Sequence, residues 1–473
     1  METFTNLINE YLGVANDFLY SKFLIILLLA VGLYFTIRTK FVQVRLFPDS
    51  IRAVTEKGGE GSISSFEALM IATASRVGTG NIAGVTTAIV LGGPGAVFWM
   101  WIMAIIGSAS AFIESTLAQV YKEKDGKIFK GGPAYYIQRA LGQRWLGIVF
   151  AILLVLTFAF GFNGLQSYTL TSAFEHYIPN FSATAAPMII GLILAVFSGI
   201  VFFGSTHIIG KISSVLVPIM ATLYVVVGFI VFFKNISGVP AAFAMIFEDA
   251  FDFKAIFGGF AGSCMALGVK RGLFSNEAGM GSAPNAAASA DVSHPAKQGL
   301  VQVLSVFIDT IVICSTTAFM ALLAGPLGEM DAKGELLNGI PFVQKALASQ
   351  FGEVGIHFVT ICIVLFASTS LIGNYFYAEF NIKFISENKV FMVIFRLLAM
   401  GMIFVGAQVD LTTAWNLADL LMGGMATVNI ISIVLLGGIA IKVLKDYEDQ
   451  KAKGLDPTFK AERIGLHNTD CWK

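Results

Sequence analysis

The chain has 473 residues, of which 56% are hydrophobic and only 13% are charged. Soluble domains carry about 25% charged and about 45–50% apolar residues, so this composition excludes a soluble enzyme, a nucleic-acid binder and a disordered scaffold. The 31 basic and 31 acidic residues give a net charge of zero, which excludes a strongly charged surface. The composition therefore predicts an all-α polytopic protein whose surroundings are the lipid bilayer.

Eleven segments are long and apolar enough to cross a bilayer, which takes about 20 mostly apolar residues. They cover approximately residues 21–37, 66–89, 95–121, 145–174, 186–206, 212–233, 257–283, 298–324, 353–380, 389–408 and 413–442. The connections between them are short, so we expect one compact helical bundle. The four cysteines and five histidines are scattered, which excludes a disulfide framework and a zinc site.

The basic residues divide unevenly between the two sides of this bundle. One alternating set of loops, together with the C-terminal tail, contains 22 Lys and Arg residues, and the other set contains five. Cytoplasmic loops carry the excess of Lys and Arg. We therefore expect the N-terminus outside and the C-terminus in the cytoplasm, in the plasma membrane or in the inner membrane of a Gram-negative cell.

Two of the eleven spans contain residues that an ordinary membrane helix does not tolerate. Residues 78–81 (Gly-Thr-Gly-Asn) lie in the second span, and residues 279–282 (Gly-Met-Gly-Ser) lie in the seventh. Glycine inside a helix costs about 1 kcal/mol relative to alanine, and close helix packing is the alternative reason for such residues. We predict that helices 2 and 7 are discontinuous, with free carbonyl groups for a cation and free N–H groups for a carboxylate.

The two glycine runs also indicate an internal repeat, because each opens a unit of five spans. Since five is odd, spans 2–6 and spans 7–11 would have opposite orientations, which is the inverted repeat of many secondary transporters. The sequence therefore predicts four parts of the chain: residues 1–60 (the extracellular N-terminus, a peripheral helix and a cytoplasmic loop), 61–235 (first repeat), 236–442 (second repeat) and 443–473 (cytoplasmic tail).

Two motifs resemble those of a known family. Residues 92–102 (Gly-Gly-Pro-Gly-Ala-Val-Phe-Trp-Met-Trp-Ile), followed by Gly107, resemble the signature of the sodium:alanine symporters. Residues 274–284 (Phe-Ser-Asn-Glu-Ala-Gly-Met-Gly-Ser-Ala-Pro) resemble that family's second characteristic stretch. The resemblance covers nearly the whole chain. It implies a leucine-transporter-type fold and import of small neutral amino acids, alanine or glycine, coupled to sodium, with no other cofactor.

The resemblance also implies which residues bind the ligands. The substrate carboxylate would contact the first broken helix, at Gly78, Thr79, Gly80 and Asn81. The sodium ligands would be main-chain carbonyls and two neighbouring hydroxyls, namely those of Ala74, Val77, Phe366, Thr369 and Ser370.

The substrate ammonium group should meet the second broken helix, near Ser275, Asn276 and Gly279. Gln166 and Asn374 are amides inside predicted spans, and they either complete the pocket or join helices to one another.

Charged residues inside membrane spans are functional hypotheses by default. Asp309 is a candidate second cation ligand or protonation site, with a buried ion pair as the alternative. Arg76 and Glu277 flank the two breaks, so an ion pair between them is a further hypothesis. Proton-coupled transport is therefore the alternative function. An ion channel is less favoured, because no repeated filter loop or charge ring is found, and no nucleophile with a base indicates an enzyme.

Overall fold

The computed structural model of the chain describes residues 2–59, 61–126, 128–204, 206–252, 263–331 and 334–472. The helices of the first half are α1 (Glu2–Leu19), η1 (Tyr20–Leu24), α2 (Ile25–Arg38), α3 (Val42–Arg45), α4 (Phe47–Val54), α5 (Ser65–Arg76), η2 (Gly80–Gly84), α6 (Val85–Gly92), α7 (Ala96–Val120), α8 (Pro133–Leu141), α9 (Arg144–Val155), η3 (Leu156–Phe162), α10 (Asn163–Ser172), η4 (Phe181–Ala183), α11 (Ala186–Phe202), α12 (Thr206–Lys234), η5 (Ile236–Gly238) and α13 (Val239–Ala250).

The helices of the second half are α15 (Cys264–Asn276), α16 (Ala283–Ser289), α17 (Pro295–Val306), η7 (Phe307–Cys314), α18 (Ser315–Ala324), α19 (Gly339–Phe351), α20 (Glu353–Ile385), α21 (Lys389–Gly406), α22 (Leu411–Ala452) and η8 (Ala461–Ile464). The strands β1 (Glu123–Asp125) and β2 (Ile128–Lys130) form one antiparallel pair.

The predicted all-α polytopic architecture is confirmed. Within the described residues, seven helices are long and apolar enough to cross a membrane. The four other predicted spans correspond to helices that are shorter or interrupted, namely α2, α5 with α6, α11, and α15 with α16. Residues 257–262, where the seventh span was expected to begin, lie outside the described residues.

Both predicted breaks are present, and each has a local cause. Helix α5 begins with a capping box at Ser64 and ends at Val77, whose ψ of 93° is extended. Helix α15 ends at Glu277, which has a left-handed φ of 56°, and Gly279 and Gly281 also have positive φ. A right-handed helix cannot continue through such residues. The second broken helix resumes as α16 and ends at Ser289, six residues beyond the predicted end at residue 283.

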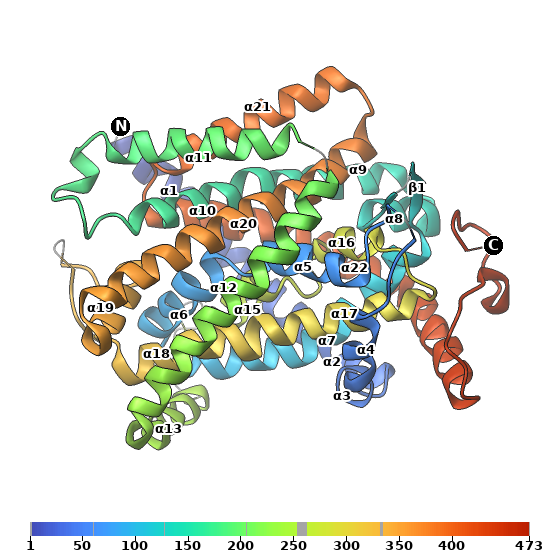
Figure 1. Cartoon of the computed structure of the whole chain (residues 1–473), viewed down its shortest axis with the longest axis horizontal. Coiled ribbons are helices and arrows are strands. Elements are labelled where there is room, and N and C mark those ends of the chain that lie inside the picture. The colour runs from blue at the N-terminus through green and yellow to red at the C-terminus, as the bar shows by residue number, and fades with distance from the viewer. Residues whose placement is uncertain are drawn as a thin grey trace.

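The two broken helices pack against different neighbouring helices. Helix α7 contacts α15, α16 and α17, so it lies behind the second broken helix. Helix α5 instead packs against α12 and α20. Figure 1 shows α7 and α17 side by side along one edge of the bundle, with α11 and α21 paired along the opposite edge. The two broken helices therefore lie inside the bundle, between these layers.

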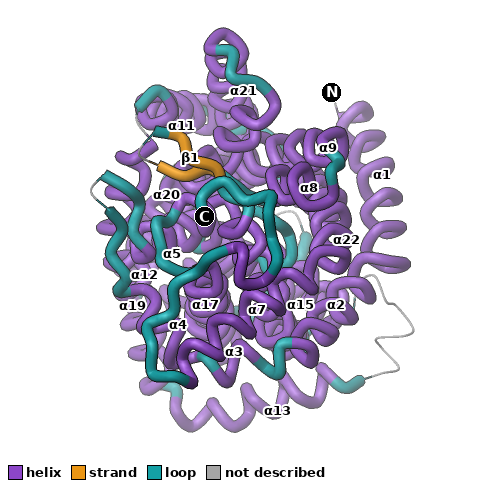
Figure 2. The backbone as a smooth tube through the Cα atoms, turned by 90° about the vertical axis from the view of Figure 1, so that its right-hand side faces the viewer, coloured by secondary structure: helices purple, strands orange, loops and turns teal. Residues whose placement is uncertain are grey.

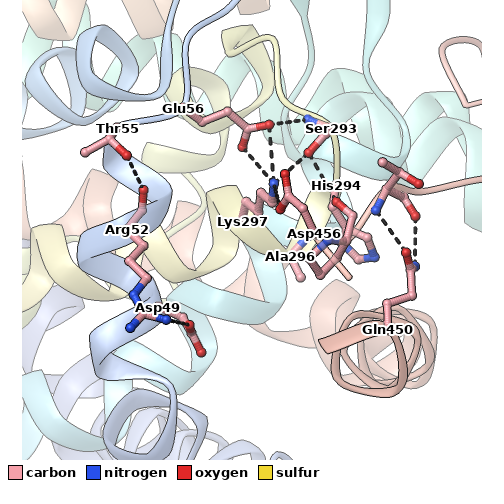
Figure 3. Close-up of polar contacts among 12 residues, drawn as sticks. Asp49, Arg52, Thr55, Glu56, Ser293, His294, Ala296, Lys297, Gln450 and Asp456 are labelled. Carbon is pink, nitrogen blue, oxygen red and sulfur yellow. Dashed lines mark hydrogen bonds and ion pairs between the residues drawn. The ribbon is translucent and has the colours of Figure 1, made fainter. Parts of the chain in front are cut away.

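The C-terminal segment folds back onto one end of the bundle. Figure 2 looks onto this end, which carries the C-terminus, β1 and α4. Helix α22 continues ten residues past the predicted end at residue 442. Beyond α22, Oδ1 of Asp456 lies 2.9 Å from Nζ of Lys297 in α17 (Figure 3). The same Nζ lies 2.7 Å from the Ser293 hydroxyl. Buried Trp472 donates its ring N–H to the carbonyl of Gln119 at 2.7 Å.

We predict that Trp472→Ala releases this segment while the membrane bundle stays folded. Truncation of a buried tryptophan costs about 3 kcal/mol, which raises the undocked population about a hundredfold. Trypsin should then cleave the purified protein near Lys453 and Lys460 correspondingly faster. Trp145→Ala, at an exposed ring, is the matched control, and equal cleavage rates in both variants would contradict the docking.

Candidate sodium and substrate site

The first break exposes two consecutive backbone N–H groups, and side-chain amides accept both of them. The N–H of Gly78 donates to Oδ1 of Asn81 at 2.9 Å. The N–H of Thr79 donates to Oε1 of Gln166 at 3.1 Å, and the Thr79 hydroxyl donates to the same oxygen at 2.6 Å. These amide oxygens occupy the positions from which the oxygens of a carboxylate would accept the same hydrogen bonds. The arrangement is therefore suited to bind a carboxylate.

The carbonyl side of the same break faces α20. The Ser370 hydroxyl lies 3.2 Å from the carbonyl oxygen of Val77 and 3.0 Å from that of Phe366. Three of the expected sodium ligands are thus brought together. Free carbonyls of unwound helices coordinate sodium in many secondary transporters.

The two remaining sodium candidates are placed differently. The Thr369 hydroxyl bonds to carbonyls of its own helix, at Leu365 (3.1 Å) and Phe366 (3.0 Å), and lies 3.7 Å from the Met220 sulfur. Both hydroxyls were expected to contribute to the sodium site, but the Ser370 hydroxyl is the one that lies beside the Val77 carbonyl. Ala74 is buried in the last turn of α5, one turn before the break. Within the described ranges there is no group of three His, Cys, Asp or Glu that could hold a metal ion.

Asp309 lies at the centre of a second polar cluster. Its Oδ1 accepts from Asn81 Nδ2 at 2.6 Å. Its Oδ2 accepts from the hydroxyls of Ser275 and Thr310, both at 2.8 Å. The side chain is fully buried. These donors are neutral, so the contacts fit the expected cation or proton site better than the alternative of a buried ion pair.

Glu277 joins the second break to the first, through a different partner from the one expected. The Ser75 hydroxyl lies 2.9 Å from Oε1 of Glu277 and 2.8 Å from Oδ1 of Asn374. Arg76 instead donates to Oε1 of Gln302 at 3.2 Å. The hypothetical ion pair between Arg76 and Glu277 is therefore not formed. Asn374 joins helices here, because it also donates to Asn163 at 2.9 Å.

Gly279 contacts the supporting helices, whereas Asn276 bonds within its own segment. Asn276 accepts from the N–H of Ala278 at 3.0 Å. The N–H of Gly279 donates to Oε1 of Glu114 at 3.1 Å, and its carbonyl accepts from Asn429 at 2.9 Å. Sequence reasoning missed Glu114 and Asn429. A signal for Glu114 was available, because it is an acidic residue inside the predicted span 95–121 and so met the criterion applied to Asp309.

Aromatic rings close over the first glycine run. The ring of Phe274 lies 4.5 Å from that of Phe162 and 4.9 Å from that of Trp415, between ring centroids. A Cβ atom added to Gly80 would lie only 2.7 Å from a carbon of the Phe274 ring. Phe274 therefore packs directly against Gly80 and leaves no room for a side chain at that position.

Comparisons with known proteins agree with this geometry. The model of the Sodium:alanine symporter family matches residues 5–461. The probable sodium/glutamine symporter GlnT of Bacillus subtilis is 46% identical over 98% of this chain and 96% of its own length. The sodium/alanine symporter AgcS of Methanococcus maripaludis is 37% identical over 94% of this chain and 98% of its own.

Among solved structures, the chain is similar to MhsT in complex with L-phenylalanine, with a TM-score of 0.56 and 14% identity. That alignment covers 82% of this chain and 98% of MhsT, and it supports the expected leucine-transporter-type fold. The chain is thus a multi-pass membrane transporter and not an enzyme, and it belongs to the Sodium:alanine symporter family, whose activity is sodium-coupled symport of amino acids.

Proposed function

We propose that this symporter imports small neutral amino acids, alanine and glycine first, on the sodium gradient. One peptide group carries the proposal. The carbonyl oxygen of Val77 faces the Ser370 hydroxyl, and the N–H at the other end of that peptide belongs to Gly78, which faces an amide oxygen. A sodium ion on the carbonyl polarises the peptide and strengthens its N–H as a donor. Sodium therefore favours a carboxylate on the opposite side.

The proposed substrate site consists of Gly78, Thr79 and Gly80, with Gln166 as the group that the carboxylate displaces. Asn81 and Ser275 are shared with Asp309, so they connect the substrate to a second cation position. The close approach of Gly80 to Phe274 favours the side chain of alanine or glycine over that of glutamine. Asn276, Gly279 and Asn374 act on the position of the broken helices and not on the substrate itself.

The transport cycle that we propose uses the two repeats, residues 61–235 and 236–442, as units that rock against each other. The uneven distribution of Lys and Arg supports an N-terminus outside and a C-terminus in the cytoplasm. Helix α5 then approaches the site from the cytoplasm, and α15 approaches it from outside. The link between Ser75 and Glu277 connects the two helices at membrane depth and has to adjust during rocking.

Uptake into proteoliposomes tests the substrate and the ion together. With an inward sodium gradient we expect concentrative uptake of labelled alanine and glycine and at least about tenfold slower uptake of glutamine, because glutamine requires displacement of the Phe274 ring. Replacement of external sodium by choline should abolish uptake. Uptake of glutamine alone would contradict the substrate assignment, and uptake in choline would contradict the coupling ion.

Proton coupling is the second candidate, and the burial of Asp309 among neutral donors supports it. An inward proton gradient without sodium should drive no alanine uptake if Asp309 binds sodium. Sustained uptake in that condition, lost in Asp309→Asn, would assign the cluster to a proton.

The sodium site itself is tested by Ser370→Ala. Loss of this hydroxyl removes one of the oxygens around the Val77 carbonyl, so the sodium concentration for half-maximal alanine uptake should rise about tenfold or more. Thr369→Ala should have a smaller effect, because its hydroxyl bonds within its own helix. Ser432→Ala, which removes a similar bond to the carbonyl four residues earlier in α22, is the matched control. An unchanged sodium requirement in Ser370→Ala would place the ion elsewhere.

A further inference from the structure

Two basic side chains inside the bundle share a single carboxylate oxygen. Nζ of Lys270 lies 2.8 Å from Oδ2 of Asp419, and Nη2 of Arg271 lies 2.6 Å from the same oxygen. The Arg271 side chain is 4% exposed and that of Asp419 is 1% exposed. The cluster therefore holds two positive charges for one negative charge, in surroundings where an uncompensated charge is costly.

Several polar atoms of the same cluster are buried and unused. Nε and Nη1 of Arg271 and Oδ1 of Asp419 have no hydrogen-bond partner in the described part of the chain, and the same is true of the Trp415 ring nitrogen. Each such atom is destabilising, because it has lost its hydrogen bonds to water and has gained none in the protein. The unused set combines donors of a guanidinium group with one carboxylate acceptor. It is complementary to a zwitterion, whose carboxylate needs donors and whose ammonium group needs an acceptor.

The cluster adjoins the proposed substrate site. Arg271 lies four residues before Ser275 on α15, so the two side chains share one face of the helix, one turn apart. The Arg271 guanidinium carbon lies 3.7 Å from the centre of the Trp415 ring, which in turn contacts the Phe274 ring. Phe274 is the residue that closes over Gly80. Two aromatic layers thus separate this cluster from the glycine run.

We propose that Arg271, Asp419 and Trp415 form a second amino-acid site, next to the transport site, that takes up the substrate before it passes the aromatic rings. The inference rests on the proposed function. The planar guanidinium of Arg271 binds the α-carboxylate through Nη2 and one of its two unused nitrogens, in place of Asp419. The free oxygen of Asp419 accepts from the ammonium group. A bound carboxylate competes with Asp419 for Arg271 and thereby weakens the contact between α15 and α22.

The probe is propionate, a carboxylate that has no ammonium group. It is titrated in choline buffer, where the sodium-dependent transport site is weak, and tryptophan fluorescence reports binding because Trp415 stacks against Arg271. We expect a saturable signal that Trp415→Phe removes. Alanine should bind about tenfold more tightly than propionate, because its ammonium group adds a contact with Asp419.

The decisive comparison uses both members of the ion pair. Arg271→Gln should weaken propionate binding about tenfold or more, and Asp419→Asn should strengthen it, because the competing carboxylate is gone. A purely structural ion pair would give shifts of the same sign, since either substitution breaks it. Arg271→Lys keeps the positive charge but loses the pair of N–H groups that binds both carboxylate oxygens. Its propionate affinity should therefore lie between those of the wild type and Arg271→Gln. This variant decides the matter if Asp419→Asn fails to fold.

Uptake measurements separate this proposal from the function on which it rests. Arg271→Gln should raise the KM for alanine several-fold at an unchanged sodium requirement, whereas Lys345→Gln, at an exposed ion pair, should leave both unchanged. A wild-type protein that transports alanine but shows no propionate signal, or shifts of equal sign in the two variants, would overturn the second site alone. Absence of sodium-driven uptake would overturn the proposed function.

Discussion

The rest of the site depends on the backbone N–H and C=O groups between Arg76 and Gly80 that have no partner within their own helix. In a bilayer an N–H or C=O group that leaves a helix has no water to bond, so a partner in the protein has to satisfy it. Here the partners come from three places far apart in the sequence: Asn81 after the break, Gln166 on α10 and Ser370 on α20. The break can therefore exist only where the bundle is assembled. Folding of the bundle and formation of the site are one event.

The same constraint couples the two ligands. Val77 and Gly78 share a peptide group whose oxygen faces the hydroxyl of α20 and whose N–H faces an amide oxygen. A cation at one end and a carboxylate at the other each favour the binding of the partner, without movement of any large element. Linkage requires this effect to be mutual, so the factor by which sodium raises amino-acid affinity equals the factor in the reverse direction.

Much of this arrangement could be predicted from the sequence, because glycine spacing and intramembrane polarity are local signals. The two broken helices were expected from residue types, whereas the approach of Ser370 to Val77 was implied by the resemblance to the sodium:alanine symporters. The roles of Thr369 and Ser370 could not be separated in that way, because neighbours on a helix face different directions and the register depends on packing. The left-handed backbone conformation of Glu277 could not be predicted either. Its carboxylate accepts hydrogen bonds from the hydroxyls of Ser282 and of Ser75, and Ser75 belongs to the other broken helix.

Equilibrium binding of labelled alanine to the purified protein tests the central claim most directly. Alanine affinity is measured over a series of sodium concentrations, and sodium affinity is measured over a series of alanine concentrations. The account predicts that each ligand tightens the other by the same factor, and that Ser370→Ala reduces both factors together. Alanine binding that is independent of sodium would show that the peptide group between Val77 and Gly78 does not couple the two sites.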